Sequence, residues 1–304
     1  QIAAGVRRQA AGGAVVRRPG GGGGRLRIGY LSGDFRRHAT AYLMCCLPEL
    51  HDRSRFEVFL YSTGPDDGSE LRHRLQSGAD RFVDVAACDD AGLAQRIADD
   101  AIDILVDLSG YTDFARPAVL ARRPAPLQVG YLGYLQTSGG DWTDYAIADR
   151  IVLPPALRTH WTERIAFLPD TLYLCDDRVI PDMPAGSRAD EGLPAERLVF
   201  CCLNASWKID PETFACWMEI LHQVPDAVLW LYATADAVED NLRRAASAAG
   251  VDAARLFFAR RVPHVQHLAR FRHADLFLDT FACNAHTTAV EALAAGLPVL
   301  KLPG

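Results

Sequence analysis

The strongest constraint on the fold is an alternation of short apolar stretches with segments of helical periodicity. It begins abruptly at Arg25 and continues, with one interruption, almost to the last residue. The expected strands of the first part are residues 26–31, 56–62, 81–85, 102–108, 127–133 and 145–149, and its expected helices are residues 40–50 and 91–100. Strands that alternate with helices predict right-handed βαβ units and a parallel sheet.

The interruption lies at residues 176–196, where three prolines and several glycines mark a connecting segment. A second series follows. Its expected strands are residues 198–203, 227–231, 256–259, 276–278 and 298–302, and its expected helices are residues 211–222, 239–249, 265–272 and 288–295. The simplest prediction is an α/β protein with two Rossmann-like lobes at residues 25–180 and 197–304, joined by a linker at residues 181–196.

The two ends of the sequence suggest a piece of a longer protein. The chain starts with Gln1 and stops directly after an apolar, strand-like run. Residues 1–24 are rich in Ala, Arg and Gly and end in five consecutive glycines, a composition typical of a flexible linker. We therefore expect a linker to an upstream domain, no signal peptide, and a second lobe that is incomplete at its C-terminus.

Composition argues against several functional classes. The chain is 49% hydrophobic and 23% charged, and without an apolar run of 18 residues it predicts no membrane partner. Its net charge of −6 argues against a nucleic-acid partner. Eight cysteines without a C-x-x-C spacing predict free thiols in a reducing cytoplasm, and no cluster of histidines or carboxylates predicts a metal site.

Candidate site residues follow the predicted strands, because ligands bind beyond the carboxyl ends of an open parallel sheet. His38 follows the first strand, where it could titrate near neutral pH or merely cap the next helix. Lys208, close to Asn204 after the first strand of the second lobe, could neutralise a phosphate or be an ordinary solvated charge. The glycine-rich loop at residues 133–140, which holds Tyr134 and Thr137, matches no phosphate-binding fingerprint.

A fourth loop, residues 283–288, precedes a predicted helix. The free N–H groups and positive dipole end of such a helix suit a pyrophosphate. Thr288 and Glu291 also have the spacing of a capping box, which needs no ligand. The two interpretations are compatible, because a capped helix end still attracts anions.

Taken in order, these segments resemble one family. The stretches LRIGYLSGDFRRHATAYL, RRPAPLQVGYLGYLQTSGG, CCLNASWKIDPETF and DLFLDTFACNAHTTAVEALAAGLPVL are similar to the catalytic region of the O-linked N-acetylglucosamine transferases, the SPINDLY-type glycosyltransferases. The resemblance covers about residues 25–304 and is to bacterial members. It implies a GT-B arrangement of two Rossmann-like lobes and transfer of N-acetylglucosamine from UDP-N-acetylglucosamine to Ser or Thr hydroxyls of proteins. The transfer would invert the sugar and need no metal or other cofactor, and upstream tetratricopeptide repeats would recruit the protein acceptors.

The resemblance also implies roles for single residues. His38 matches a histidine that lines the sugar and acceptor site, Lys208 a lysine that contacts the diphosphate, and His267 a histidine that stacks on the uracil. Glu291 stands where the family has an acidic residue that reaches the ribose. The residues that match the segment holding the donor phosphates are Cys283, His286, Thr287 and Thr288, and Asn204 belongs to the same expected donor site.

The chain departs from the family pattern near the expected sugar pocket, where Tyr134 and Thr137 lie. Leu135 and Gln136 replace a Pro-Gly pair of the family's loop, and Trp207 replaces a Tyr before the lysine. Three alternatives therefore stay open: a protein N-glucosyltransferase, a small-molecule glycosyltransferase of the same fold, and a non-catalytic module that binds UDP or a protein.

Overall fold

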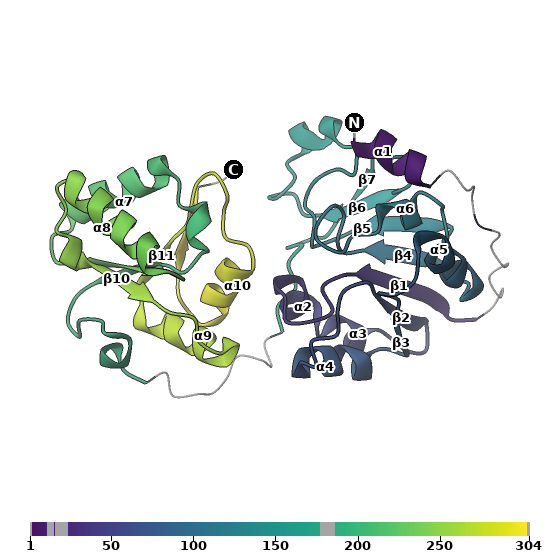
Figure 1. The fold of residues 1–304 in the computed structure, drawn as a ribbon, viewed down its shortest axis with the longest axis horizontal. Coiled ribbons are helices and arrows are strands. Elements are labelled where there is room, and N and C mark those ends of the chain that lie inside the picture. Colours follow the sequence, from purple (N-terminus) through teal and green to yellow (C-terminus); the bar gives the residue numbers. More distant parts are fainter. Residues whose placement is uncertain (1, 11–14, 16–23, 177–185, 303–304) are drawn as a thin grey trace. The chain divides into compact units, whose positions relative to one another are not determined.

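The computed structural model describes residues 2–10, 15, 24–176 and 186–302 (Figure 1). The chain divides into two compact units, Gln1–Asp176 and Asp177–Gly304. Every strand pair in both is parallel, and a helix lies between most successive strands, β5 and β6 being the exception. The predicted α/β class with two parallel sheets is confirmed.

The first unit holds a seven-stranded sheet in the order β3-β2-β1-β4-β5-β6-β7. Its strands are β1 (Leu26–Ser32), β2 (Phe56–Ser62), β3 (Arg81–Asp84), β4 (Ile104–Asp107), β5 (Leu127–Gly130), β6 (Tyr145–Ala148) and β7 (Arg164–Phe167). Its helices after the first strand are α2 (Ala39–Met44), α3 (Leu47–Leu50), α4 (Glu70–Gly78), α5 (Asp90–Asp99) and α6 (Pro117–Leu120). The order reverses direction between β1 and β4, as in dinucleotide-binding folds.

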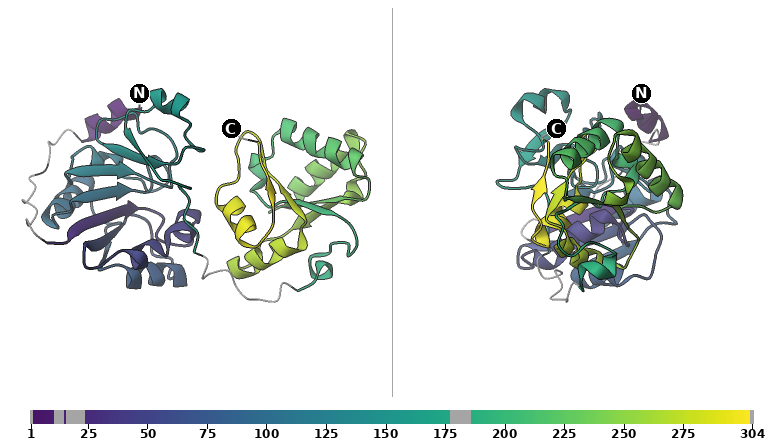
Figure 2. Two further views of the ribbon diagram at one scale, coloured as in Figure 1. Left: turned by 180° about the vertical axis from the view of Figure 1, so that it is seen from behind. Right: turned by 90° about the vertical axis from the view of Figure 1, so that its left-hand side faces the viewer.

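The second unit repeats this plan with five strands in the order β10-β9-β8-β11-β12. Its strands are β8 (Val199–Cys202), β9 (Val228–Tyr232), β10 (Leu256–Ala259), β11 (Leu276–Leu278) and β12 (Val299–Leu300). Its helices are α7 (Pro211–Gln223), α8 (Asp236–Ala248), α9 (His264–Arg270) and α10 (Thr287–Ala294). Helices α7 and α8 cover one face of the sheet and α9 and α10 the other, as two opposite views make clear (Figures 1 and 2). The order reverses between β8 and β11.

Each unit has a core of its own. In the first, Phe59, Tyr61 and Leu105 from the sheet are almost completely buried with residues of α5 and α6. In the second, Trp217 of α7 and Trp230 of β9 are at most 1% exposed. The continuous apolar runs of these central strands are typical of parallel strands covered on both faces.

One predicted helix differs from the structure, and helices α4 and α6, like strand β7, were not among the predicted elements. The single helix expected at residues 40–50 is two short helices, α2 and α3, because Pro48 cannot continue the first helix: it has no N–H, and its ring would collide with the carbonyl of Met44. Strand β7 was not predicted. Its burial alternates along four residues, which gives too short a pattern to separate from a loop.

The expected flexible linker at residues 1–24 is wrong for its first part. Residues Ile2–Gln9 form helix α1, in which Val6 is 6% exposed and belongs to the first core. Arg7 forms an ion pair with Asp141. The buried Val6 side chain thus packs a segment against the first unit, although its composition alone favoured a linker. Residues 11–14 and 16–23 lie outside the described residues.

The expected linker at residues 181–196 is also wrong in part. Residues 181–185 lie outside the described part of the chain. Beyond them Leu193 is 4% exposed in the second core, and Arg188 donates to the carbonyl oxygens of His273, Ala195 and Arg197. This half of the segment is therefore packed on the second unit.

Candidate functional site

The loops after β1, β2, β4 and β5 meet at the carboxyl edge of the first sheet. A Cβ atom on Gly64 would lie 2.0 Å from the carbonyl oxygen of Gly33, and one on Gly133 would lie 1.9 Å from that of Leu108. Only glycine permits such approaches. The sequence therefore brings the loop that carries His38 and the loop that carries Tyr134 against their neighbours at the point where the strand order reverses.

His38 is the N-cap residue of α2. Its Nδ1 atom lies 3.3 Å from the backbone nitrogen of Thr40 and 3.3 Å from Oδ2 of Asp34. A neutral Nδ1 can accept the Thr40 N–H, whereas a protonated one can donate to Asp34, so the capping role and the titrating role use the same atom. Burial lowers the pKa of His38, with the Asp34 carboxylate opposing that effect. The imidazole is thus held in the neutral form that can accept a proton near neutral pH.

Tyr134 and Thr137 lie on the loop after β5. The Tyr134 hydroxyl donates to Oε1 of Gln136 at 3.3 Å, and its ring stands edge-on to Tyr111 at 5.5 Å. Thr137 donates to Oε2 of Glu163 at 2.7 Å.

Glu163, which precedes β7, holds this loop in place. Besides Thr137, its carboxylate accepts the backbone N–H of Ser138 at 2.7 Å, the Ser138 hydroxyl, and the Thr162 hydroxyl at 3.1 Å. The side chain is almost fully buried. Sequence reasoning missed Glu163, because its partners lie about 25 residues earlier in the chain and no local pattern marks them.

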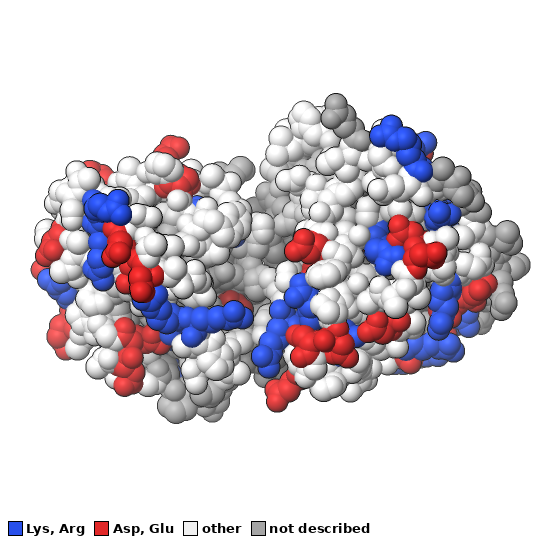
Figure 3. Space-filling model, in the orientation of Figure 1, with Lys and Arg blue, Asp and Glu red and all other residues white. Residues whose placement is uncertain are grey.

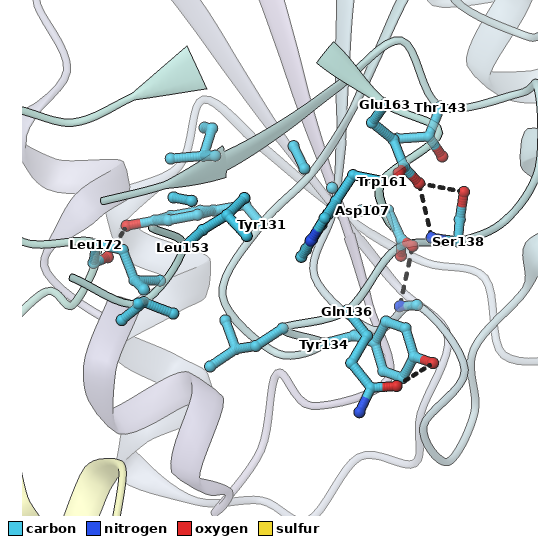
Figure 4. A pocket seen from close by; sticks show the side chains of 17 residues that line it. Asp107, Tyr131, Tyr134, Gln136, Ser138, Thr143, Leu153, Trp161, Glu163 and Leu172 are labelled. Carbon is cyan, nitrogen blue, oxygen red and sulfur yellow. Dashed lines mark hydrogen bonds between the residues drawn. The ribbon is translucent and has the colours of Figure 1, made fainter. Parts of the chain in front are cut away.

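A pocket that is open to solvent lies beside this loop, and the space within it and at its open mouth together is about 580 Å³ (Figure 4). Its lining comes from the ends of β4, β5 and β6 and the segments that follow them. The residues whose side chains matter for its chemistry are Asp107, Tyr134, Val152, Leu153, Trp161 and Glu163. Burial raises the pKa of Asp107 to about 6, although the backbone N–H groups of Ser109 and Gly110 counteract it.

Lys208 lies in the second unit, in the 3₁₀ turn after β8. Its Nζ atom donates to the carbonyl oxygen of Asn284 at 2.9 Å and lies 5.6 Å from the centre of the Trp207 ring. The Trp207 side chain is 74% exposed. Asn204, by contrast, is 1% exposed, and its amide donates inward to Asp279 at 3.1 Å and Thr280 at 3.0 Å.

Asp279, directly after β11, organises the loop that Lys208 touches. Its Oδ1 atom accepts the amide of Asn204, the backbone N–H of Thr280 at 2.8 Å, and the backbone N–H of Ala285 at 2.7 Å. The carboxylate is 3% exposed. Asn284 in turn donates to the Thr280 carbonyl at 2.6 Å. Sequence reasoning missed Asp279, although a carboxylate at the carboxyl end of a central strand was a signal that could have found it.

The start of α10 lies next to this loop. His286 is the N-cap residue, without a side-chain cap, and Thr287 and Thr288 are the first two helical residues. Burial lowers the pKa of His286, and the positive charges of Lys208 and Lys301 lower it further. Cys283, half-buried, contributes its carbonyl oxygen to the Thr280 hydroxyl at 2.7 Å. This region combines a lysine, a neutral histidine and the unpaired N–H groups of a helix start.

The capping box predicted at Thr288 and Glu291 is wrong. The helix begins one residue earlier than expected, and the Glu291 carboxylate faces α9: Oε1 lies 2.7 Å from Nε2 of His264, and Oε2 lies 3.6 Å from Nε2 of His267. The His267 ring also contacts Phe271 edge-on at 5.0 Å. Burial lowers the pKa of His267, against the attraction of Glu291. His264 was not predicted; its spacing of three residues from His267 was the available signal.

The structure thus groups the predicted residues within each unit. In the first, His38, Tyr134 and Thr137 lie on neighbouring loops of one sheet edge. In the second, the predicted residues form two groups. One is the pair His267 and Glu291. The other consists of Asn204, Lys208, Cys283, His286, Thr287 and Thr288. His38 follows β1, Lys208 follows β8, and residues 283–288 follow β11, so these residues lie where the strand order of each sheet reverses, which is where such folds bind ligands. Within the described residues no group of three or more His, Cys, Asp or Glu could hold a metal ion.

Two properties of the whole chain bear on its partners. No helix of the described part is long and apolar enough to cross a membrane. On the face drawn in Figure 3, Lys and Arg alternate with Asp and Glu, without a broad field of one sign.

Comparison with known proteins finds a matching family and related enzymes. The sequence model of glycosyl transferase family 41 matches residues 17–183 and 177–304. The chain is 38% identical over 284 residues, 92% of its length, to the probable UDP-N-acetylglucosamine–peptide N-acetylglucosaminyltransferase SEC of Arabidopsis thaliana, and that region is 29% of the plant protein. A related enzyme of Caenorhabditis elegans is 30% identical, with 34% of its length matched. The chain thus spans about a third of the length of these relatives.

A solved structure agrees. A K341M mutant of the O-GlcNAc transferase of Thermobaculum terrenum superposes with a TM-score of 0.87 and 36% identity, covering 98% of this chain and 57% of that one. Together with the two parallel sheets, this similarity confirms the fold class of the GT-B glycosyltransferases.

Proposed function

Because this chain belongs to glycosyl transferase family 41, we propose that it transfers N-acetylglucosamine from UDP-N-acetylglucosamine to Ser and Thr hydroxyls of proteins. The transfer inverts the sugar and uses no metal. The relatives' names supply the donor and the peptide acceptor. The first unit holds the acceptor and the second the donor, and upstream tetratricopeptide repeats recruit protein acceptors in the cytoplasm.

The observation that carries this proposal is the cationic, donor-rich region around Lys208. Breaking the sugar–phosphate bond leaves negative charge on UDP, which the protein must compensate. Lys208 supplies a full positive charge, and the N-terminus of α10 at Thr287 and Thr288 supplies free N–H groups and the positive end of a helix dipole. Burial, and then the nearby Lys208 charge, lower the pKa of His286, which favours a neutral hydrogen-bonding group.

The remaining predicted donor residues fit the nucleoside. His267 offers an aromatic face for the uracil, and Glu291, already hydrogen-bonded to His264, offers a carboxylate oxygen for the ribose. Asn204 acts indirectly: its buried amide donates to Asp279 and Thr280 and so positions the loop at residues 279–286 for the donor. On the acceptor side, His38 orients the hydroxyl and accepts its proton, and Tyr134 and Thr137 border the sugar.

The first test removes the charge of Lys208. We expect the Lys208→Ala variant to lose about a hundred- to a thousandfold in turnover, the usual cost of one group that stabilises developing charge, while its circular dichroism stays that of the wild type. Transfer from labelled UDP-N-acetylglucosamine to a Ser/Thr peptide is measured by mass spectrometry. Arg244→Ala, which removes an exposed cation from α8, is the matched control and retains full turnover.

The donor is tested separately by calorimetry. Titration with UDP, UDP-N-acetylglucosamine and UDP-glucose should give heat for all three, because the diphosphate and uridine dominate binding, and peptide transfer only with UDP-N-acetylglucosamine. Transfer from UDP-glucose to Asn would identify an N-glucosyltransferase instead. Nucleotide binding without transfer to any acceptor would leave a non-catalytic module.

A further inference from the structure

The pocket of the first unit has a chemical character that the proposed reaction does not use. Its walls are largely apolar: Leu153, Leu172 and Val152 line it together with the Trp161 ring (Figure 4). A flexible hydrocarbon chain can lie along such walls, and an indole face attracts a cation.

The polar side of the pocket is negative. Asp107 is 8% exposed, and its two oxygens each accept one backbone N–H, from Ser109 at 3.1 Å and from Gly110 at 2.9 Å. Each oxygen can accept a second hydrogen bond. Glu163 also lines the pocket, but Thr137, Ser138 and Thr162 already occupy its carboxylate.

No positive charge balances Asp107 inside the pocket. None of the described residues that line it is Lys, Arg or His. Burial already makes the charged form of this carboxyl costly, as its raised pKa reflects. An occupant with a long apolar stem and a cationic head would therefore match both the walls and the charge.

We propose that this pocket binds a Lys or Arg side chain of the acceptor polypeptide, with its stem along Leu153 and Trp161 and its cationic group on Asp107. The inference rests on the proposed function, because it takes the chain's acceptor to be a polypeptide. It adds a specificity determinant beside the assigned sugar site, with which the pocket shares Tyr134.

His38 and the pocket lie on the same edge of the sheet. Asp107 ends β4, which neighbours β1, and Leu31 of β1 is its register partner. Neighbouring strands are about 4.8 Å apart, and the rest of the pocket extends over β5 and β6, up to three strands from β1. An extended peptide covers about 3.3 Å per residue. The basic side chain is therefore expected within about four residues of the acceptor Ser or Thr.

The test uses one acceptor peptide in which each position up to five residues on either side of the Ser carries Lys, norleucine or Glu in turn. Norleucine has nearly the length and apolar stem of Lys without its charge. With the wild-type chain we expect Lys to exceed norleucine about tenfold in kcat/KM and in peptide affinity at one position within about four residues of the Ser. Affinity is measured by fluorescence anisotropy with UDP present, which needs no turnover.

Two variants assign the preference to the pocket. Asp107→Asn removes the charge and should bring the Lys-to-norleucine ratio close to one. Val152→Lys places a competing cation at the pocket, at a site that is 42% exposed and tolerates a long side chain, and should have the same effect. Val152→Met is the matched control of similar length and should keep the tenfold ratio.

The outcomes separate the two proposals. A Lys preference that survives both Asp107→Asn and Val152→Lys overturns the pocket assignment, and so does equal binding of Lys and norleucine by the wild-type chain, which would mark a purely apolar pocket. Absence of transfer to every peptide, with the binding ratio still dependent on Asp107, would instead contradict the proposed function and leave the pocket assigned.

Discussion

Single carboxylates determine how the loops of this protein are placed. Asp279 gathers one side-chain amide and two backbone N–H groups on one oxygen. The Glu163 carboxylate accepts one backbone N–H and the hydroxyls of Thr137, Ser138 and Thr162. Neither was predicted from the sequence: Glu163 acts mainly on residues about 25 positions earlier, and the position of Asp279 at a strand end was a local signal that was not used. His38 and Lys208 could be predicted, since their position after the first strand of each lobe is a local feature.

Replacement of Asp279 tests its positioning role. Asp279→Ala leaves the buried backbone N–H groups of Thr280 and Ala285 without this acceptor and removes one of the two acceptors of the Asn204 amide. We therefore expect a loss of at least about 2 kcal/mol in the free energy of unfolding, measured with urea. Asp279→Asn keeps an acceptor oxygen and removes only the charge. We expect it to lose less stability and to lower the pKa of His286, which the Asp279 charge raises.

The His286 pKa is read by NMR of the imidazole protons. An unchanged value in Asp279→Asn, together with wild-type affinity for UDP, would mean that Asp279 serves the fold alone.

At the scale of elements, sequence patterns predicted strand positions better than helix boundaries. Strands β10 and β11 coincide with the expected ranges, because their apolar runs are bounded by polar residues. The helix expected at 40–50 was split by Pro48, and the cap of α10 was misplaced by one residue. Both errors concern local hydrogen bonds, which apolar periodicity does not report.

Replacement of two glycines by alanine should change stability in opposite directions. Gly133→Ala would drive a Cβ into the Leu108 carbonyl, so we expect a loss of about 3 kcal/mol of stability and disorder in the loops after β4 and β5. Gly5→Ala lies within α1 with no atom within 4 Å of its Cβ, so it should stabilise that helix by up to about 1 kcal/mol. Hydrogen exchange of residues 131–140 and 2–9 checks both. Slower exchange of the loop in Gly133→Ala would contradict the steric argument.

At the scale of the whole molecule, acid should affect the two units differently. In the second unit, burial lowers the pKa of His267 and His286. A histidine whose folded pKa lies below its unfolded value of about 6.5 binds fewer protons when folded, so its contribution is complete above pH 6.5 and is lost as pH falls through the folded pKa. The second unit should lose stability between pH 7 and 5.

The first unit contains an opposing effect. His38 and His51 also have lowered pKa values, but those of Asp107 and Asp34 are raised by burial. A carboxyl with a raised folded pKa costs stability above that pKa, and protonation below about pH 6 relieves this cost at Asp107. Hydrogen exchange at pH 7 and 5, corrected for intrinsic rates, should show a larger loss of protection in β8–β11 than in β1–β5; an equal loss would contradict this assignment.

The chain contains only two lysines, Lys301 and Lys208, and Lys208 is the one whose ammonium group donates to Asn284. An amine-reactive reagent therefore has few targets, and peptide mapping can follow each one by itself. Protection of Lys208 from acylation by added nucleotide, compared with Lys301 in the same digest, would report occupancy directly in crude extracts, without a coupled assay or a purified acceptor.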